Sequence, residues 1–326
     1  MITCRRRPAG RDYGPVLALL KETLPSWKEV DDIKTAETAF EKSTFALFAY
    51  DNDRLTGIIR AISDDAAWTL LADLAAIPGP EGHSAKTMLV QACLDRFAGH
   101  EVFTVSEPGD IAFYEEMGLL RSKNAFTRDG EDHPVSGYPL SDYYLPKGYR
   151  YETEFYPFAG NFPAGQKSSR DLSRAQLRYQ TDAEGVDFGE VNDVLCRAFL
   201  DQRDRDVTEK TFRESTYLIF AYDGDRLAGC ARAVSDTVRQ ALILNVAVAP
   251  DYQGLHLGGN LLDRLCAQMK GQNVFLNTHP GGVGFYNRGP YFRNKTALLY
   301  PAHPDTPEEI QKGFDLPKGY RFIDEY

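Results

Sequence analysis

An internal duplication constrains this chain more than any other feature of its sequence. The stretch Ser43-Thr-Phe-Ala-Leu-Phe-Ala-Tyr-Asp-Asn-Asp-Arg-Leu55 returns 172 residues later as Ser215-Thr-Tyr-Leu-Ile-Phe-Ala-Tyr-Asp-Gly-Asp-Arg-Leu227. The same separation pairs Arg60 with Arg232, Asp64 with Asp236, Pro108-Gly109 with Pro280-Gly281, and Phe113-Tyr114 with Phe285-Tyr286. A period of about 170 residues is far too long for a solenoid unit. The chain therefore consists of two copies of one domain.

Both copies predict the same order of elements. An opening strand (Ile2 to Arg6 in the first copy, Leu177 to Gln180 in the second) precedes helices, and a hairpin follows. The hairpin turn of the second copy carries Asp223-Gly224, a strong signal for a tight turn. A long apolar strand, a loop with its helix, a short strand and a short helix ending in Phe-Tyr come next, and terminal strands close each copy. We predict domains at 1–157 and 177–326, joined by a linker at 158–176 that is rich in Gly, Pro, Ser and charge.

The second copy contains a loop suited to a phosphate. An apolar strand from Leu242 to Ala249 ends at Pro250, the loop Gln253-Gly-Leu-His-Leu-Gly-Gly259 follows, and a helix is expected from about Asn260. Backbone N–H groups of such a loop, together with the positive end of the helix dipole, favour a phosphate or pyrophosphate. A Walker loop is excluded because no Gly-Lys-Ser/Thr is present. A Rossmann loop is excluded because His256 replaces its second glycine and no acidic residue lies on the next strand.

The loop and the strand before it resemble the pyrophosphate loop of the GCN5-related N-acetyltransferases (the GNAT family), which bind acetyl-CoA. The family pattern is Gln-x-x-Gly-x-Gly/Ala, and His256 departs from it at a position where a left-handed backbone is disfavoured. The resemblance implies an α/β (α+β) chain of two tandem GNAT-type domains, each a mixed central sheet flanked by helices. It also implies that acetyl-CoA is held by Val246, Ala247, Val248, Gln253, Gly254, Leu255, His256, Leu257, Gly258 and Gly259.

The first copy has a poorer loop at the equivalent place. Glu81 replaces Gln253, which puts a carboxylate where a pyrophosphate should lie, and Lys86 replaces Gly258. Lys86 could still contact a phosphate directly. We predict that the first copy is a degenerate domain without acetyl-CoA, which covers a face of the second copy or completes its acceptor pocket.

Tyr286 is the candidate general acid. In the GNAT family a tyrosine after the fifth strand commonly protonates the departing CoA thiolate, and Tyr286 and Tyr114 both match that position. After Tyr286 the helix is expected to end early, because Gly289-Pro290 follows. The alternative for Tyr286 is a packed aromatic beside Phe285 and Tyr291, and for Tyr114 packing is the main interpretation.

The general base is left open by the sequence. His279 precedes the tyrosine helix and titrates in a suitable range, although it could equally be a polar contact near the CoA arm. Asp236 could hold a cationic acceptor, but its equivalent Asp64 in the degenerate copy favours a structural turn. A water chain would leave no signature. The resemblance further implies a bulge between Asn245 and Val248 that frees backbone N–H groups to polarise the thioester carbonyl.

Composition excludes several classes of protein. Net charge is −10, which argues against nucleic acid as a partner and suits a cationic amine only weakly. The sequence has no apolar run of membrane-spanning length, and without an apolar segment after Arg7 we expect no signal peptide. Five scattered cysteines and six dispersed histidines predict reduced thiols, a cytoplasmic location and no metal.

These observations predict an acetyl-CoA-dependent N-acetyltransferase that acts on a primary amine of a small acceptor through the second copy. Two alternatives stay open. One is a CoA-binding regulatory or scaffold protein that has lost catalysis, and the other is an acyltransferase for a longer acyl-CoA. The sequence identifies neither the acceptor nor the oligomeric state.

Overall fold

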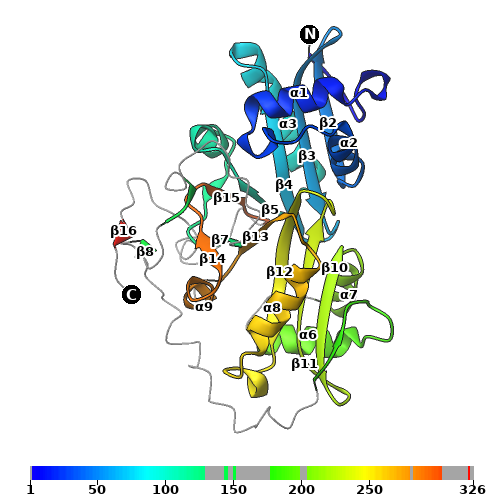
Figure 1. Cartoon of the computed structure of the whole chain (residues 1–326), viewed down its shortest axis with the longest axis vertical. Helices are drawn as coiled ribbons and strands as arrows, with labels where there is room; N and C mark the ends of the chain where they lie inside the picture. Colours follow the sequence, from blue (N-terminus) through cyan, green and yellow to red (C-terminus); the bar gives the residue numbers. More distant parts are fainter. Residues whose placement is uncertain are drawn as a thin grey trace.

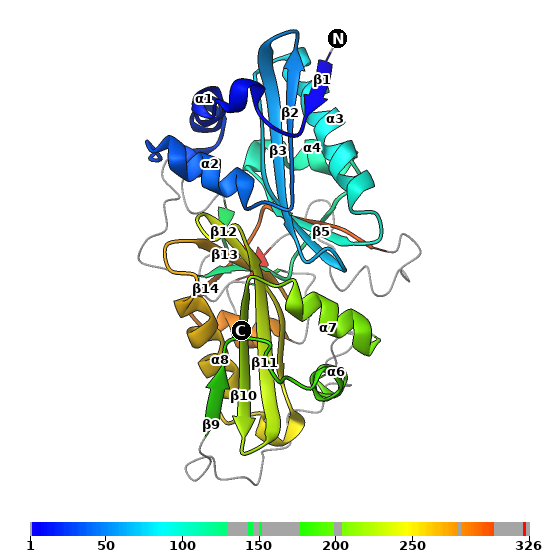
Figure 2. The same ribbon diagram turned by 90° about the vertical axis from the view of Figure 1, so that its right-hand side faces the viewer.

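Two sheet-and-helix domains stack along the long axis of the molecule (Figure 1). The computed structural model describes residues 2–128, 143–145, 150–151, 177–198, 204–279, 282–302 and 322–323. Each domain contains one seven-stranded mixed sheet with helices on both faces, as the view in Figure 2 shows. The predicted fold class, two tandem α/β domains with mixed central sheets, is confirmed.

The first domain is built mainly from residues 2–121. Its sheet has the order β1-β2-β3-β4-β5-β15-β6, in which only β4 and β5 are parallel neighbours. Its strands are β1 (Ile2–Arg5), β2 (Phe45–Asp51), β3 (Arg54–Ser63), β4 (Trp68–Ala76), β5 (Glu101–Val105) and β6 (Leu120–Arg121). Its helices are α1 (Gly14–Thr23), α2 (Ile33–Glu41), α3 (Pro80–Arg96) and α4 (Ile111–Glu116).

The second domain repeats this plan. Its sheet has the order β14-β7-β13-β12-β11-β10-β9, with β12 and β13 parallel. Its strands are β9 (Leu177–Gln180), β10 (Tyr217–Asp223), β11 (Arg226–Ser235), β12 (Gln240–Val248), β13 (Asn273–Asn277) and β14 (Tyr291–Arg293). Its helices are α6 (Phe188–Arg197), α7 (Arg205–Arg213), α8 (Leu257–Ala267) and α9 (Val283–Asn287).

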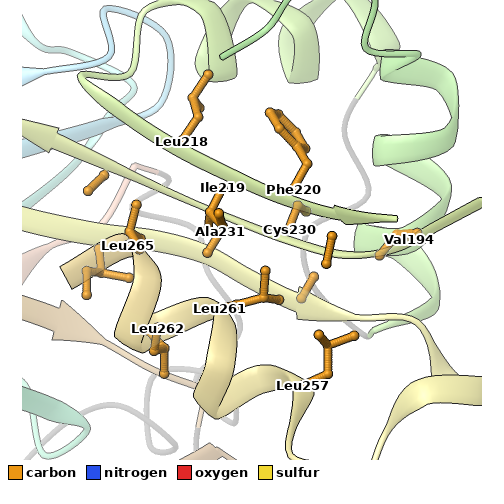
Figure 3. Close-up of a cluster of buried hydrophobic side chains, with 14 of the residues drawn as sticks. Val194, Leu218, Ile219, Phe220, Cys230, Ala231, Leu257, Leu261, Leu262 and Leu265 are labelled. Carbon is orange, nitrogen blue, oxygen red and sulfur yellow. The ribbon is translucent and has the colours of Figure 1, made fainter. Parts of the chain in front are cut away.

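Leucines of α8 hold that helix against the sheet. Leu257, Leu261 and Leu265 recur at helical spacing, so they share one face, and each is at most 1% exposed. They lie in one buried cluster with Ile219 and Ala231 of the central strands (Figure 3). This packing fixes the start of α8 beside the end of β12, where the predicted phosphate loop lies.

One strand of each repeat lies in the sheet of the other repeat. Strand β7 (Ala125–Arg128) comes from the first copy but pairs with β13 and β14 of the second. Its equivalent, β15 (Ala297–Tyr300), pairs with β5 and β6 of the first. The sequence predicted that terminal strands close each copy, and the structure shows instead that the two copies exchange them. Neither sheet is therefore complete without the other half of the chain.

The two domains share one buried apolar cluster. It consists of equivalent residues contributed by both repeats, namely Ile62 with Val234, Leu70 with Leu242, Phe103 with Phe275, and Ala125 with Ala297. Because each of these eight side chains is at most 9% exposed, the cluster forms a continuous core across the junction. The junction is thus an interior of the molecule and not a surface contact.

Some predictions lie outside the described residues. The linker at 158–176, the Pro280-Gly281 pair and the repeated segment at 316–321 belong to this group, so the boundary between 1–157 and 177–326 stays a prediction. A short antiparallel pair, β8 (Arg150–Tyr151) with β16 (Phe322–Ile323), lies next to the repeated segments. In the parts of the chain that are described, none of the helices combines the length and the apolar character needed to cross a membrane.

The strand exchange predicts that the chain unfolds as one unit. Both tryptophans, Trp27 and Trp68, lie in the first domain, so their fluorescence reports on one sheet while circular dichroism reports on both. We expect the two signals to coincide during urea unfolding. Phe126→Ala, on the exchanged strand β7, should remove about 3–5 kcal/mol of stability and shift both signals together.

The matched control is Val207→Ala on exposed α7, which should change stability by less than about 0.5 kcal/mol. A fluorescence transition that stays in place while the circular dichroism transition moves would contradict the shared fold.

Candidate active site

A cleft opens in the second domain where two parallel strands separate. Strand β12 pairs with β13 from Gln240 to Ile243, and beyond this point the two strands diverge. The space between them widens into a cleft of about 940 Å³ that is bounded by β12, the start of α8, and α9. Its volume is in the range of small-molecule sites. Divergence of β12 from β13 also leaves backbone groups on that edge of β12 without a ladder partner from β13.

A bulge interrupts β12 at the head of the cleft. Cys230 of β11 faces Ala247 and Arg232 faces Leu244, so Asn245 and Val246 together oppose the single residue Ala231. Asn245 has a left-handed backbone with φ of 52°. The additional residue of a bulge is left out of the ladder, and its N–H group is turned elsewhere. The bulge implied by the family resemblance is therefore present, and Val246 lines the cleft beside it.

Helix α8 begins at Leu257, three residues earlier than predicted. His256 precedes it with φ of 62° and ψ of 7°, so this histidine adopts the left-handed conformation that the sequence analysis regarded as disfavoured. The first helical hydrogen bond runs from Asn260 N–H to the His256 carbonyl at 3.1 Å. Gly258 and Gly259 therefore belong to the first helical turn, where N–H groups have no helical partner and attract an anion.

Most of the predicted cofactor residues line this one cleft. They are Val246, Val248, Gln253, Gly254, His256, Leu257, Gly258 and Gly259. Ala247 does not line it, because strand alternation turns its side chain into the core, where it is 1% exposed. Leu255 is also absent from the lining. The Gln253 amide donates to the Val248 carbonyl at 3.0 Å and ties the loop to the end of the strand.

Tyr286 combines the two interpretations that the sequence left open. It lines the cleft, yet it is only 6% exposed and packs between Phe126 and Tyr291, with ring centroids 5.5 and 5.3 Å away. Burial raises the pKa of the Tyr286 hydroxyl above its ordinary value, so it stays protonated and can donate. Phe126 belongs to the exchanged strand, so the first repeat forms part of the wall behind this tyrosine.

His279 lies across the same cleft from the phosphate loop. It follows β13 and is half-buried, and burial lowers the pKa of its imidazole below its ordinary value. A lowered pKa means that the ring is neutral near pH 7 and can accept a proton. The amide of the preceding residue, Thr278, donates to the Asn124 carbonyl of the first repeat at 3.0 Å.

Comparison with known proteins identifies the second half of the chain. A family model described as the acetyltransferase (GNAT) family matches residues 188–289, from the start of α6 to just beyond α9. A rice protein (Oryza sativa subsp. japonica) named serotonin N-acetyltransferase 2, chloroplastic, is 29% identical over 148 residues, which cover 43% of this chain and 74% of that protein.

This half of the chain is similar to the GNAT family.

Two further proteins extend this comparison. An Arabidopsis thaliana protein named GCN5-related N-acetyltransferase 1, chloroplastic, is 30% identical over 129 residues, covering 38% of this chain and 66% of that protein. The crystal structure of a GCN5-related N-acetyltransferase from Sphaerobacter thermophilus covers 94% of this chain and 97% of its own, with a TM-score of 0.50 and 13% identity. At that identity the similarity shows the fold, and it extends over both domains.

In the first domain the equivalent of the open cleft is closed at the start of α3, and a smaller cavity of about 90 Å³ beside Asp110 and Tyr114 remains. Helix α3 begins at Pro80, so the predicted loop from Glu81 to Lys86 is helical and not a loop. The Lys86 ammonium contacts both carboxylate oxygens of Asp110 at 2.7 Å. In the second domain the equivalents of these two residues are Gly258 and Gly282, which lack side chains and both line the open cleft. A salt bridge thus fills the space that two glycines leave empty.

Sequence reasoning missed several residues of the cleft wall. The cleft is also lined by Ala198, Tyr252, Leu262, Asp263, Thr278, Gly282, Phe285, Arg288, Gly289, Pro290 and Tyr291. One signal in the sequence could have revealed this difference between the copies. Lys86 and Asp110 of the first copy are both replaced by glycine, Gly258 and Gly282, at the equivalent positions of the second. Asp236, considered as an acceptor ligand, lies outside the cleft. It accepts three backbone N–H groups of its own turn, from Val238, Arg239 and Gln240.

The contrast between the clefts predicts one acetyl-CoA per chain. Isothermal calorimetry should give a stoichiometry of one, and Gly258→Lys, which introduces the residue of the first domain, should weaken binding at least about tenfold by filling the cleft. Ala267→Lys adds the same charge to an exposed site on α8 and serves as the control. Two sites per chain, or unchanged affinity in Gly258→Lys, would contradict this assignment.

Proposed function

We propose that the second domain transfers the acetyl group of acetyl-CoA to a primary amine of a small acceptor by direct attack. The observation that carries the proposal is the convergence of three features on one cleft: the β12 bulge, the glycine-rich start of α8, and Tyr286. The N–H groups of the first α8 turn would bind the pyrophosphate, and acetyl-CoA supplies the activated thioester. The diverging strands would hold the pantetheine arm.

The residues around the cleft support each proton and charge movement of this reaction. Backbone N–H groups at the bulge beside Val246 stabilise negative charge on the thioester oxygen as the amine attacks. The amine nitrogen forms a bond to the carbonyl carbon and the carbon–sulfur bond breaks. Tyr286 donates its hydroxyl proton to the departing sulfur, since its raised pKa keeps that proton in place. The product is an amide and free CoA.

His279 is the proposed base for the amine. Its ring is neutral near pH 7 because burial lowers its pKa, so it can take the proton that the attacking nitrogen loses. A water molecule between the ring and the amine would serve the same route.

Aromatic side chains favour an apolar amine as acceptor. The cleft is lined by Tyr252, Phe285, Tyr286 and Tyr291, and Phe285 is 41% exposed at its edge. Serotonin, named in the rice relative, is therefore the first acceptor to test, with polyamines and lysine peptides as comparisons. Parallel assays with longer acyl-CoA donors test the acyl preference. A cytoplasmic location remains a prediction from the cysteine pattern, and both plant relatives are named as chloroplastic.

Replacing the proposed acid tests the chemistry. Tyr286→Phe keeps the aromatic packing against Phe126 but removes the proton donor, so kcat should fall roughly 10²–10⁴-fold while acetyl-CoA affinity is kept. The matched control is Tyr114→Phe at the equivalent position of the closed domain, which should leave kcat unchanged. Free CoA release, followed with a thiol reagent, measures both. Equal rates for Tyr286→Phe and the parent would remove this residue from the mechanism.

The pH dependence of the rate tests the proposed base. His279 must be neutral to act, so kcat/KM should fall as the pH drops through its lowered pKa and level off above it. In His279→Ala this acid limb should disappear and the plateau should fall roughly 10²–10⁴-fold. His83→Ala, an exposed histidine of α3, is the control and should keep the limb. An unchanged profile in His279→Ala would assign the base to solvent.

A further inference from the structure

Two arginines cross the domain junction in opposite directions. Arg232 of β11 lies 2.8 Å from the carboxylate of Asp64 in the first domain, and Arg60 of β3 binds Asp236 in the second. All four side chains are fully buried. The two pairs are equivalent under the repeat, so each domain supplies one arginine and one aspartate. Removal of either partner would leave an uncompensated buried charge, which strongly favours the paired arrangement.

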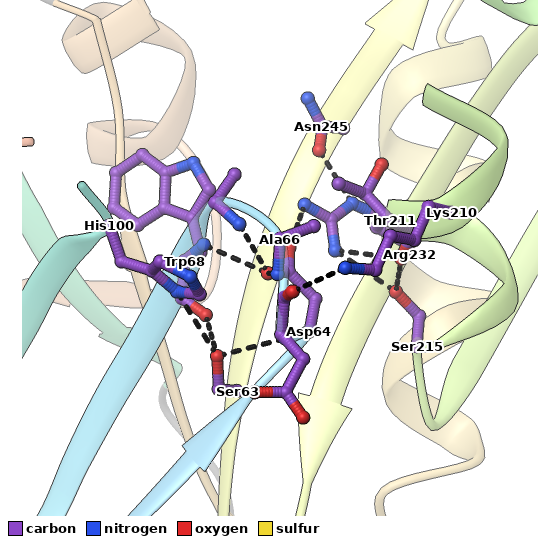
Figure 4. A network of polar contacts seen from close by, with 12 residues as sticks. Ser63, Asp64, Ala66, Trp68, His100, Lys210, Thr211, Ser215, Arg232 and Asn245 are labelled. Carbon is purple, nitrogen blue, oxygen red and sulfur yellow. Dashed lines mark hydrogen bonds and ion pairs between the residues drawn. The ribbon is translucent and has the colours of Figure 1, made fainter. Parts of the chain in front are cut away.

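The aspartates are held in place by their own turns. Asp64 accepts backbone N–H groups of Ala66, Ala67 and Trp68 at 3.1, 2.8 and 2.9 Å (Figure 4). Burial alone would raise the pKa of Asp64, but Arg232 and these three donors outweigh it and hold the pKa below its usual range. Asp64 is therefore a fixed negative charge that orients Arg232.

The two arginines differ in what they hold on their other side. Arg60 donates to Asp73 of β4, a second buried carboxylate. Arg232 donates through Nε to the side-chain oxygen of Asn245 at 2.6 Å (Figure 4). Asn245 is the left-handed residue of the β12 bulge, whereas its equivalent Asp73 has no positive φ. Only the Arg232 network thus ends on the bulge beside the open cleft.

Asn245 needs such support. A left-handed backbone is less favourable for asparagine than for glycine, although asparagine tolerates it better than most residues, so contacts that hold the side chain help to fix the bulge. The hydrogen bond from Arg232 fixes the Asn245 side chain, and thereby the direction of the peptide group that leads to Val246. Ser215 and the Thr211 carbonyl accept from the same guanidinium and leave it little freedom.

We propose that Asp64 of the first domain is a positioning residue for the reaction of the second, acting through Arg232 and Asn245 on the bulge that polarises the thioester carbonyl. This inference rests on the proposed acetyl transfer. The first domain would then contribute to catalysis by orienting the backbone N–H groups of the β12 bulge.

The pseudo-symmetry supplies a matched test. Asp64→Asn turns a donor amide toward Arg232 and loosens the bulge. We expect kcat to fall about tenfold or more, while the affinity for acetyl-CoA stays within about twofold of the parent. Loss of an entire oxyanion donor lowers kcat by about 10²–10³-fold, so a misplaced donor should cost less. The control is the double variant Asp73→Asn/Asp236→Asn. It leaves Arg60 between two asparagines, as Asp64→Asn leaves Arg232, but Arg60 does not contact Asn245 of the bulge. Its kcat should stay near that of the parent.

A second variant guards against misfolding of Asp64→Asn. In Asn245→Gly the backbone can still adopt a positive φ without strain, but the side-chain acceptor for Arg232 is lost. We therefore expect kcat to fall in the same way as in Asp64→Asn. Asn245→Asp restores an acceptor of the same shape and should recover most of the rate. Thermal unfolding of every variant shows that each is folded at the assay temperature.

Infrared spectroscopy tests the hydrogen bonds at the bulge without an acceptor amine. Acetyl-CoA labelled with ¹³C at the thioester carbonyl should show a lowered carbonyl stretch when bound to the parent protein, because hydrogen bonds weaken the C=O bond. The stretch should return toward that of free acetyl-CoA in Asp64→Asn and stay lowered in the double variant.

The outcomes separate the two proposals. If kcat and the carbonyl stretch change equally in Asp64→Asn and in the double variant, the positioning role is overturned while acetyl transfer stands. If the parent binds acetyl-CoA with a lowered stretch but turns over no amine, the proposed transfer fails and the stretch alone decides the positioning role. A parent that does not bind acetyl-CoA overturns both.

Discussion

Exchange of strands β7 and β15 between the repeats is the constraint on which the rest of the structure depends. Backbone groups of β7 pair with β13 and β14, and those of β15 pair with β5 and β6, so each sheet has a strand that its own repeat does not supply. Hydrogen bonds repeat this reciprocity: Thr278 N–H donates to the Asn124 carbonyl, and Ser106 N–H to that of Thr296. The distance between the domains, and hence the shape of the junction, follows from these ladders.

The domain with the open cleft is consequently assembled from both halves of the chain. Phe126 of the first repeat packs on Tyr286, and Asp64 holds the arginine that reaches the bulge. The first domain is closed at its Lys86–Asp110 contact, yet its Asp64 reaches the arginine beside the open cleft of the second. Buried ion pairs give modest stability because desolvation opposes their attraction, but they strongly favour one arrangement over others.

Much of the fold followed from the sequence, because the repeat at a separation of 172 residues gives two domains and the pattern of apolar residues gives their strands. The exchange could not be predicted. Ala125–Arg128 and Ala297–Tyr300 have equivalent patterns, so pairing with either sheet satisfies the same backbone and side-chain preferences. The His256 conformation was also beyond reach, because local preference disfavours it and the packing of Leu257, Leu261 and Leu265 decides where α8 starts. Closure by Lys86 and Asp110 required knowing that residues 24 apart meet in space.

The Lys86–Asp110 contact has a thermodynamic consequence for the whole chain. In the first domain the Lys86 side chain, held by Asp110, fills the place of a ligand, so this contact forms without any bound metabolite. The second domain has an open cleft, and a ligand present at 100 times its dissociation constant would add about 2.7 kcal/mol of stability there. Because the exchanged strands join the two sheets, that increment is shared by both domains. Resistance to unfolding and proteolysis would then follow the cellular supply of whatever compound the open cleft binds.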